Sequence, residues 1–360
     1  MEKKFEMTYT KQEAIEILKN IMEEHNVSRL LVVRGKKSYK ECGGSEVVEK
    51  LFETHNMEIR DFYDFSANPK KEDVDKGVEL IKQYQPDAIL AIGGGSVIDM
   101  AKLCRYYSGK REIPLIAMPT TAGTGAEVTR FAVCYKDGVK QSIEDDAIQA
   151  NYAVLVPELT MKNGTYLTAC TGFDALAQAI EAYWNIYAGD VSDAFAMKAI
   201  EMLFSTLPAM EGDLEWRSRM LLGAYYAGMA INMTHTTAPH ALSYVLTSKY
   251  KYPHGHAVAL TFPYFFEKNV HCAEKEYADA DYAEYNAKMH KLLNVLGWKL
   301  NEDLFARMKD YIEKIGLGYD PTRPFESEVV EKGVNLLRAQ NNPVQLDEQV
   351  IKEAVASITK

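Results

Sequence analysis

The sequence predicts an α/β protein, with a mostly parallel, Rossmann-like sheet in an N-terminal domain and an all-α helical C-terminal domain. In roughly the first 160 residues, short apolar runs rich in β-formers alternate with amphipathic helical stretches, which is the pattern of βαβ units. From about residue 163, apolar residues recur at helical spacing instead. We therefore predict an α/β domain over 1–162 and a helical domain over 163–360.

The individual elements follow from the same two patterns. Apolar runs predict strands within 29–35, 57–65, 87–95, 114–125 and 152–159. The run 131–143 carries Asp137-Gly138 between two β-prone stretches and predicts a hairpin. The first 25 residues are charged and helical in pattern, and helical spacing continues over 166–184, 193–207 and 215–233 and again after residue 275.

Composition narrows the class of protein. The chain is 47% hydrophobic and 26% charged, with a formal net charge of −10, so a nucleic-acid or anionic-membrane surface is disfavoured. Its five cysteines form no C-x-x-C pair, which indicates reduced thiols in a cytoplasm. No signal peptide and no membrane span are expected, and we expect a homodimer.

Two glycine-rich loops suggest a nucleotide site. "LAIGGGSVIDMAK" and "PTTAGTGAEVTR" each follow a predicted strand, and glycines let a phosphate approach the backbone at the start of a helix. A single such loop is as often only a tight strand-to-helix turn, but two at adjacent strand ends match where open sheets bind nucleotides. The candidate residues are Gly94, Gly95, Ser96, Asp99, Thr120, Thr121 and Thr124.

A second group of residues suggests a metal. Asp174 and Gln178 are spaced i, i+4 on a predicted helix and so share a face. His254 lies in the rigid turn "YPHGH", and His240 lies upstream in an apolar helix. An Asp near a helix start is more often a cap, and a lone His on an apolar helix more often a core residue. Two imidazoles with a carboxylate nevertheless suit zinc or ferrous iron.

Four motifs together resemble the group III iron-dependent alcohol dehydrogenases: "GGGSVIDMAK", "PTTAGTGAEVT", "TGFDALAQAIE" and "HALSYVLTSKYKYPHGHAVAL". The resemblance implies NAD(P) between the two domains, with Lys140 among its contacts, and Fe²⁺ or Zn²⁺ held by one Asp and three His. By position, Asp174, His240 and His254 match three of these ligands. Gln178 stands where the family has the remaining histidine, so it either coordinates weakly or leaves a three-residue site.

The family also implies roles near the substrate. Tyr244 replaces a histidine that many members place there, and Tyr244, His256 or water is the candidate proton donor. "EAYWNI", "THTTAPHALSYVLTSKY" and "PHGHAVALTFP" are most similar to the phosphonoacetaldehyde reductase (2-hydroxyethylphosphonate dehydrogenase) branch. This branch reduces a small anionic aldehyde. Candidate phosphonate contacts are the hydroxyls of Thr234, Thr236 and Thr237 before Pro239, with Arg130, His235 and Lys251 as countercharges.

The predicted cofactor is NADPH, with NADH as the alternative. The strand over 29–35 ends in Arg34-Gly35-Lys36-Lys37, where many NAD-preferring relatives carry an Asp for the ribose 2′-hydroxyl. Three other functions stay open. One is a dehydrogenase for neutral short-chain alcohols, diols or aldehydes, another is a dehydroquinate-synthase-like cyclase, and the third is a metal-free binding protein.

Overall fold

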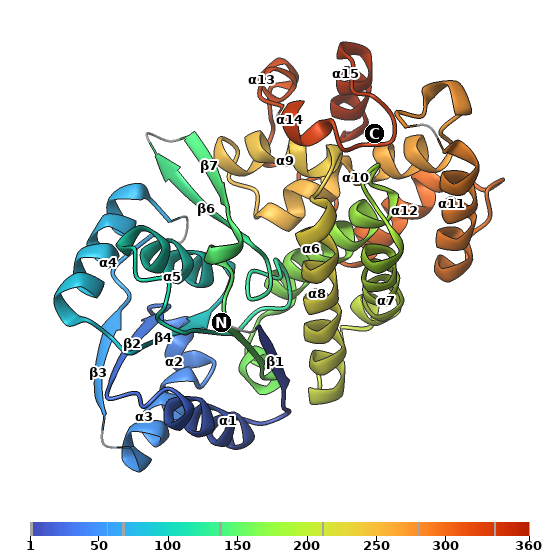
Figure 1. Ribbon diagram of the computed structural model, residues 1–360. Coiled ribbons are helices and arrows are strands. Elements are labelled where there is room, and N and C mark those ends of the chain that lie inside the picture. The colour runs from blue at the N-terminus through green and yellow to red at the C-terminus, as the bar shows by residue number, and fades with distance from the viewer. Residues whose placement is uncertain are drawn as a thin grey trace. The chain divides into compact units, whose positions relative to one another are not determined.

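The computed structural model describes residues 3–55, 57–66, 69–136, 139–210, 212–279, 281–334 and 336–359. The chain divides into two compact units, and we describe each by itself (Figure 1). The first unit comprises 1–163 and 211–225. The second comprises 164–210 and 226–360.

The first unit is built on a six-stranded parallel sheet with the order β1-β8-β5-β4-β2-β3. Five of its strands lie inside the predicted runs: β2 (Arg29–Arg34), β3 (Glu58–Phe62), β4 (Ala88–Gly93), β5 (Leu115–Pro119) and β8 (Tyr152–Leu155). The predicted hairpin is also present, as β6 (Phe131–Lys136) paired antiparallel with β7 (Val139–Glu144); its turn, Asp137-Gly138, lies outside the described residues. The predicted fold class is therefore confirmed for this unit.

Helices cover both faces of this sheet (Figure 1). Because successive side chains of a strand point to opposite faces, Leu31 and Val33 pack with α4 (Lys71–Tyr84) and α5 (Gly95–Ser108). Leu30 and Val32 pack with α1 (Lys11–Glu24) and α3 (Gly44–Thr54), near the short α2 (Ser38–Glu41). Burial on both sides explains why these strands read as continuous apolar runs rather than alternating ones.

The N-terminus differs from the prediction. Its first residues were expected to be helical, but Lys4–Met7 form the edge strand β1, parallel to β8. The helix begins only at Lys11, where Thr10 and Glu13 form a capping box. The strand escaped detection because only two of its four side chains are even partly buried, so its sequence carries a weak apolar signal.

The second unit is helical, as predicted. Its long central helices are α6 (Thr165–Trp184), α9 (Ala238–Ser248) and α10 (His254–Val270). The remaining helices are α7 (Asp190–Thr206), α11 (Tyr282–Leu296), α12 (Leu304–Lys314), α13 (Ser327–Lys332), α14 (Leu336–Ala339) and α15 (Glu348–Ser357), while α8 (Leu214–Thr234) has its N-terminal half in the first unit. Short 3-10 turns lie at Asp146–Ile148, Pro157–Thr160, Leu207–Ala209 and Glu274–Glu276.

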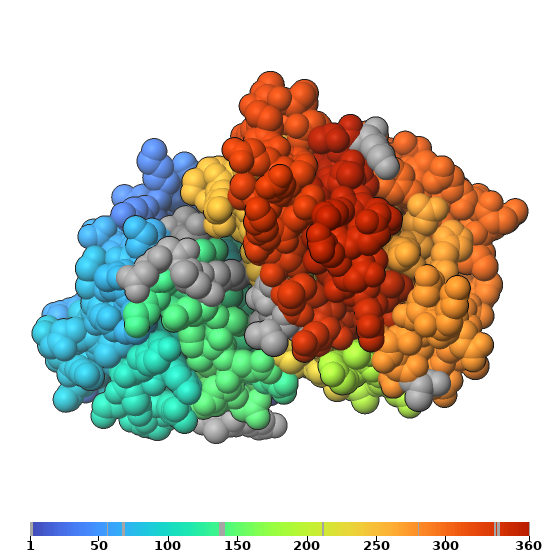
Figure 2. All heavy atoms as spheres, turned by 90° about the horizontal axis from the view of Figure 1, so that it is seen from above, coloured from blue at the N-terminus to red at the C-terminus, as the bar shows by residue number. Residues whose placement is uncertain are grey.

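A hydrophobic cluster joins α9, α10, α13 and α15 of this unit, with Leu242, Leu246 and Phe265 fully buried in it. In Figure 2 the last helices of the chain, in red, gather on one face of the second unit. Within the described part of the chain, none of the helices combines the length and the apolar character needed to cross a membrane.

Candidate functional site

Three of the predicted metal ligands meet in the second unit. One ligand atom each of Asp174, His240 and His254 lies within 4.8 Å of the other two. Asp174 Oδ1 is 3.3 Å from His240 Nε2 and 3.7 Å from His254 Nε2. Asp174 and His240 are buried, whereas the His254 side chain is 32% exposed. Of the three side chains, only that of His254 is partly exposed, and a catalytic metal site keeps one position open for substrate.

A glycine allows the two ligand-bearing helices to approach this closely. His254 is the first residue of α10 and follows Pro253, and α6 carries Asp174. A Cβ atom built at Gly255 would overlap the carbonyl oxygen of Cys170 and lie 3.1 Å from Cβ of Asp174. Only glycine therefore fits where α10 starts against α6.

A buried carboxylate orients His240. Glu181 is fully buried, and its Oε1 hydrogen-bonds His240 Nδ1, which leaves Nε2 directed toward Asp174. Its other oxygen accepts from the backbone N–H and, at 3.0 Å, from the hydroxyl of Thr237. A carboxylate behind a ligating imidazole fixes its tautomer and raises its basicity. Burial disfavours the imidazolium, but the charges of Glu181 and Asp174 outweigh it and raise the pKa of His240 to about 9.

Gln178 lies beside the same cluster. Its Nε2 is 3.4 Å from Asp174 Oδ2, while its Oε1 is buried and has no hydrogen-bond partner among the described residues. A buried acceptor left unpaired costs about 1–3 kcal/mol. An orphaned oxygen next to a carboxylate and two imidazoles is a donor set that fits a divalent metal ion.

The two candidate proton donors have different surroundings. The ring of Tyr244 lies parallel to that of His254, at 11° and 6.3 Å between centroids. His256 is buried, with Nδ1 2.8 Å from Tyr166 Oη and Nε2 2.9 Å from the carbonyl oxygen of Gly318. Burial lowers the pKa of His256, and its two ring nitrogens are engaged with Tyr166 and Gly318. Tyr244 lies beside His254, one of the candidate metal ligands.

In the first unit the two glycine-rich loops lie against each other. Gly94 precedes α5 and makes no side-chain cap, so the first N–H groups of that helix are not capped by a side chain. A Cβ at Gly94 would lie 3.2 Å from Thr121 Oγ1, and a Cβ at Gly95 would crowd the hydroxyl of Thr124. Thr120 donates its backbone N–H to Gly93 at 3.0 Å. The structure therefore brings the predicted phosphate-binding loops together, with Ser96 in the first turn of α5.

Asp99, an expected cofactor contact, binds the backbone that follows the second loop. Its Oδ2 accepts the backbone N–H of Val133 at 3.1 Å. One turn later, the fully buried Lys102 donates to the carbonyl oxygens of Thr129 at 2.7 Å and Phe131 at 3.0 Å. The two side chains of α5 thus clamp the backbone that leaves the second loop; we call Asp99 and Lys102 the loop clamp.

Two further cofactor residues were expected. Lys140 lies in β7 opposite Tyr135, and its side chain falls outside the described part of the chain. Gly35 follows β2, where a Cβ would overlap the hydroxyl of Ser38. Of the bases around it, Arg34 pairs with Asp61 at 2.8 Å and Lys36 with Asp64 at 3.1 Å.

The predicted substrate contacts differ in their burial and in their hydrogen-bond partners. The hydroxyl and backbone N–H of Thr237, an expected phosphonate contact, both donate to Glu181. Thr236 is buried and its carbonyl accepts from Asn341 at 3.4 Å. Arg130 pairs with Glu144 at 3.0 Å. Lys251 is exposed and donates to the carbonyl of Ser248 at 2.7 Å.

Two more upstream residues were named with this group. Thr234 is buried and donates to the carbonyl of Ala230 at 3.2 Å, as a helix-end hydroxyl often does. His235 follows α8 with a positive φ of 70°. Neither observation places an anion beside them.

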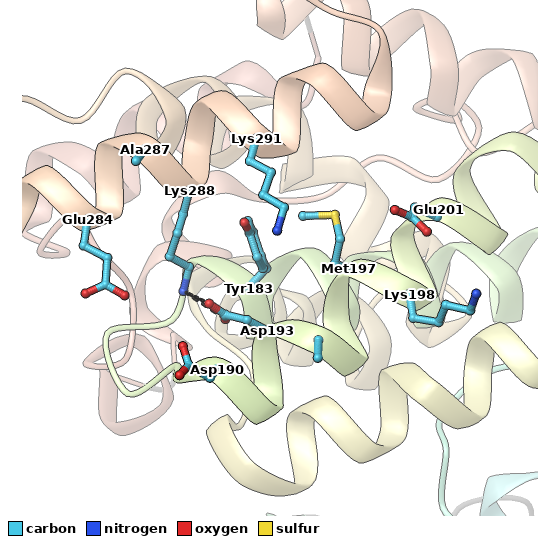
Figure 3. Close-up of a pocket in the computed structure, with 11 residues that line it drawn as sticks. Tyr183, Asp190, Asp193, Met197, Lys198, Glu201, Glu284, Ala287, Lys288 and Lys291 are labelled. Carbon is cyan, nitrogen blue, oxygen red and sulfur yellow. Dashed lines mark hydrogen bonds and ion pairs between the residues drawn. The ribbon is translucent and has the colours of Figure 1, made fainter.

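Figure 3 shows a pocket of about 540 Å³ elsewhere in the second unit, lined by side chains of α6, α7 and α11. Its Lys288 points at Asp193 and pairs with it at 2.7 Å. None of the predicted site residues lines this pocket. The metal cluster is therefore a separate site.

Sequence reasoning missed Glu181, Lys102 and Gly255. Glu181 could have been found, because positions 174, 178 and 181 share one helix face at i, i+4, i+7. The roles of Lys102 and Gly255 could not be predicted locally. Lys102 binds the backbone of Thr129 and Phe131, and Gly255 packs against Cys170, and only the fold brings these residues together.

Comparisons with known proteins agree with this geometry. The family model "Iron-containing alcohol dehydrogenase" matches residues 6–157, and "Fe-containing alcohol dehydrogenase family, C-terminal" matches residues 168–319. The chain is 31% identical over 323 residues to the NADPH-dependent butanol dehydrogenase of Clostridium saccharobutylicum, covering 84% of this chain and 80% of that one. It is 29% identical to aldehyde-alcohol dehydrogenase 2 of Entamoeba histolytica, of whose length it spans only 36%.

Solved structures are similar over nearly the whole chain. The sulfoacetaldehyde reductase from Bifidobacterium kashiwanohense, solved in complex with NAD⁺, has a TM-score of 0.85 at 27% identity, covering 99% of this chain and 97% of that one. An iron-containing alcohol dehydrogenase from Thermococcus thioreducens also reaches 0.85, at 25% identity, with 99% and 98% covered.

Proposed function

The chain belongs to the iron-containing alcohol dehydrogenase family, and we propose that within it the protein reduces phosphonoacetaldehyde to 2-hydroxyethylphosphonate with NADPH. Membership makes it an NAD(P)-linked oxidoreductase of alcohols and aldehydes. In the proposed reaction, hydride passes from C4 of the dihydronicotinamide to the aldehyde carbon and a proton passes to the aldehyde oxygen. The products are the alcohol and NADP⁺.

The observation that carries this proposal is the convergence of Asp174, His240 and His254. These three side chains would hold the divalent metal. When bound, such an ion acts as a Lewis acid that polarises a carbonyl oxygen. Glu181 holds the ring of His240 in place through Nδ1. The partial exposure of His254 leaves one side of the cluster accessible.

The remaining groups bind and orient. Tyr244, beside His254, is the proposed proton donor at the aldehyde oxygen. Gly94, Gly95 and the threonines of the second loop are proposed to bind the pyrophosphate, which helix starts and exposed N–H groups favour. Lys251 is the proposed countercharge for the phosphonate, because its one described hydrogen bond is to a neutral carbonyl. Arg130 is weaker in this role, since Glu144 already balances its charge.

The similarity to a sulfoacetaldehyde reductase supports an anionic substrate. Sulfoacetaldehyde and phosphonoacetaldehyde are both two-carbon aldehydes that differ in whether a sulfonate or a phosphonate is attached. The motifs around His240 and His254 favour the phosphonate. A neutral short-chain alcohol is the second candidate, favoured by the name of the butanol dehydrogenase relative.

The preference for NADPH rests on the end of β2. Asp61 lies in β3 opposite Val32 and pairs with Arg34. This ion pair competes with a hydrogen bond from a ribose hydroxyl to Asp61. Lys37 is exposed at the start of α2 and is the proposed partner of the 2′-phosphate. A kcat/KM for NADPH above that for NADH supports this part of the proposal, and the reverse order removes it.

The substrate is tested by comparing kcat/KM for phosphonoacetaldehyde, sulfoacetaldehyde and butyraldehyde. We expect phosphonoacetaldehyde to be preferred, and Lys251→Gln to lower its kcat/KM about tenfold, as loss of one charge-assisted contact does. The same variant should leave butyraldehyde unchanged. Lys249→Gln, at a neighbouring exposed lysine, is the control. Equal activity on butyraldehyde would favour the neutral-alcohol function instead.

A further inference from the structure

We infer that the amide oxygen of Gln178 is a fourth metal donor, and that it weakens the site's preference for zinc over manganese. This inference rests on the metal-binding role proposed above for Asp174, His240 and His254. Gln178 stands where a site with three imidazoles would have its third, so its chemistry affects which ion the protein selects.

The position of Gln178 carries the first step. It lies one helical turn after Asp174 on α6, and both side chains are at least nine-tenths buried. Asp174 turns Oδ1 toward the two histidines and Oδ2 toward the Gln178 amide. The carboxylate is therefore flanked by imidazoles through one oxygen and by the amide through the other.

The orphaned atom carries the second step. Gln178 Oε1 is buried and finds no hydrogen-bond partner among the residues that the structure describes, although buried polar atoms are nearly always paired. The amide nitrogen already approaches Asp174, at the long distance of 3.4 Å. What the described side chains leave unsatisfied is an acceptor, and a cation satisfies an acceptor directly.

The chemistry of the donor carries the third step. With Gln178, the shell has two imidazole nitrogens and two oxygens. Imidazole suits zinc and iron, whereas carbonyl and carboxylate oxygens suit manganese and magnesium. Replacing an imidazole by an amide oxygen therefore lowers the affinity for zinc more than that for manganese.

Three variants test the inference: Gln178→Leu, Gln178→His and, as a control, Gln83→Leu. Gln83 also donates to a carboxylate one helical turn earlier, that of Glu79, but this pair is exposed and lies on α4 of the first unit. Dissociation constants for Zn²⁺ and Mn²⁺ are measured by chelator competition on the full chain, without substrate. The visible absorption of the Co²⁺-loaded protein reports the coordination shell.

We expect Gln178→Leu to weaken binding of both ions at least tenfold and to change the Co²⁺ spectrum. Gln178→His should tighten zinc at least tenfold more than manganese, and Gln83→Leu should change neither. The metal-free protein should be no less stable with leucine at 178, because the unpaired acceptor is gone. A merely structural glutamine gives the opposite result, with a lower melting temperature and an unchanged Kd.

The outcomes also separate this inference from the proposed function. If the wild-type protein binds neither ion, both are overturned. If it binds metal and Gln178→Leu binds equally well, only the role of Gln178 is overturned. An equal gain for zinc and manganese in Gln178→His contradicts the claim about metal selection.

Discussion

At the residue scale, the buried carboxylate of Glu181 decides how His240 is presented. It accepts hydrogen bonds from the backbone N–H and the hydroxyl of Thr237 and binds His240 Nδ1, so the imidazole is held by the protein before any ligand arrives. From the sequence, Thr237 is expected to contact a substrate anion, because a hydroxyl before a helix start is suited to one. Its hydrogen bonds to Glu181 join segments far apart in the chain, so no local pattern predicts them.

Glu181→Gln should weaken metal binding roughly 10- to 100-fold, as the loss of an outer partner of a ligating histidine does. The amide keeps the size of the side chain but removes the charge that favours the His240 orientation. Chelator competition measures the change. Exposed Glu201→Gln on α7 is the control. An unchanged metal Kd in Glu181→Gln contradicts the role assigned to this residue.

Glu127 makes stability depend on pH. It is buried in the second loop, and burial raises its pKa from 4.5 to about 7, against the opposing effect of Lys102. Between these two values the folded chain retains a proton that the unfolded chain has lost. Its contribution to stability is therefore complete below pH 4.5 and lost as pH rises through 7.

Glu127→Gln should remove this dependence. The stability of the variant relative to wild type should rise between pH 5 and pH 7.5 by on the order of 2–3 kcal/mol, which follows from the size of the shift. Urea unfolding at the two pH values measures it. A difference that is the same at both values would show that Glu127 titrates normally.

At the scale of elements, the start of α10 against α6 assembles the metal cluster. Apolar spacing predicted α6, but His254 was expected in a rigid turn, whereas it is the first residue of α10. The approach of the two helices was not predicted either, because the contact between Gly255 and Cys170 joins positions far apart in the chain. The sequence indicated Gly255 only as part of a tight turn. The packing shows that this position has no room for a Cβ atom.

Gly255→Ala should push α10 away from α6 and separate His254 from Asp174. We expect metal affinity to fall at least 100-fold and stability to fall by about 1–3 kcal/mol, the usual cost of overpacking. Gly164→Ala, where a Cβ meets open space, is the matched control. Retained metal affinity in Gly255→Ala would mean that the close approach is not required.

The loop clamp gives α5 a second role. Lys102→Met should weaken NADPH binding at least tenfold, because the backbone after the second loop loses the donor that Thr129 and Phe131 share. Zinc affinity should stay unchanged, since the candidate ligands Asp174, His240 and His254 all lie in the second unit. Exposed Lys82→Met is the control, and NADPH fluorescence titration measures binding. Unchanged NADPH affinity in a folded Lys102→Met protein contradicts the clamp.

At the scale of the whole molecule, the sequence was sufficient for the class of fold. A parallel sheet and a helical second half follow from periodicity, and five of the six sheet strands were located correctly. The edge strand β1 was missed because its neighbours bury little of it. The candidate metal ligands were predicted from spacing and from motif resemblance. Glu181 shares the helix face of Asp174 and could have been predicted, whereas the contact of Gly255 with Cys170 needed the tertiary structure.

Metal binding by Asp174, His240 and His254 is tested most directly by the metal content of the purified protein, measured by mass spectrometry. NADPH-dependent reduction of phosphonoacetaldehyde is assayed on the same samples. We expect close to one divalent ion per wild-type chain. Both Asp174→Ala and His254→Ala should lose that ion and the activity. A wild-type protein that reduces the aldehyde without metal, or variants that keep both ion and activity, would contradict this metal-binding role.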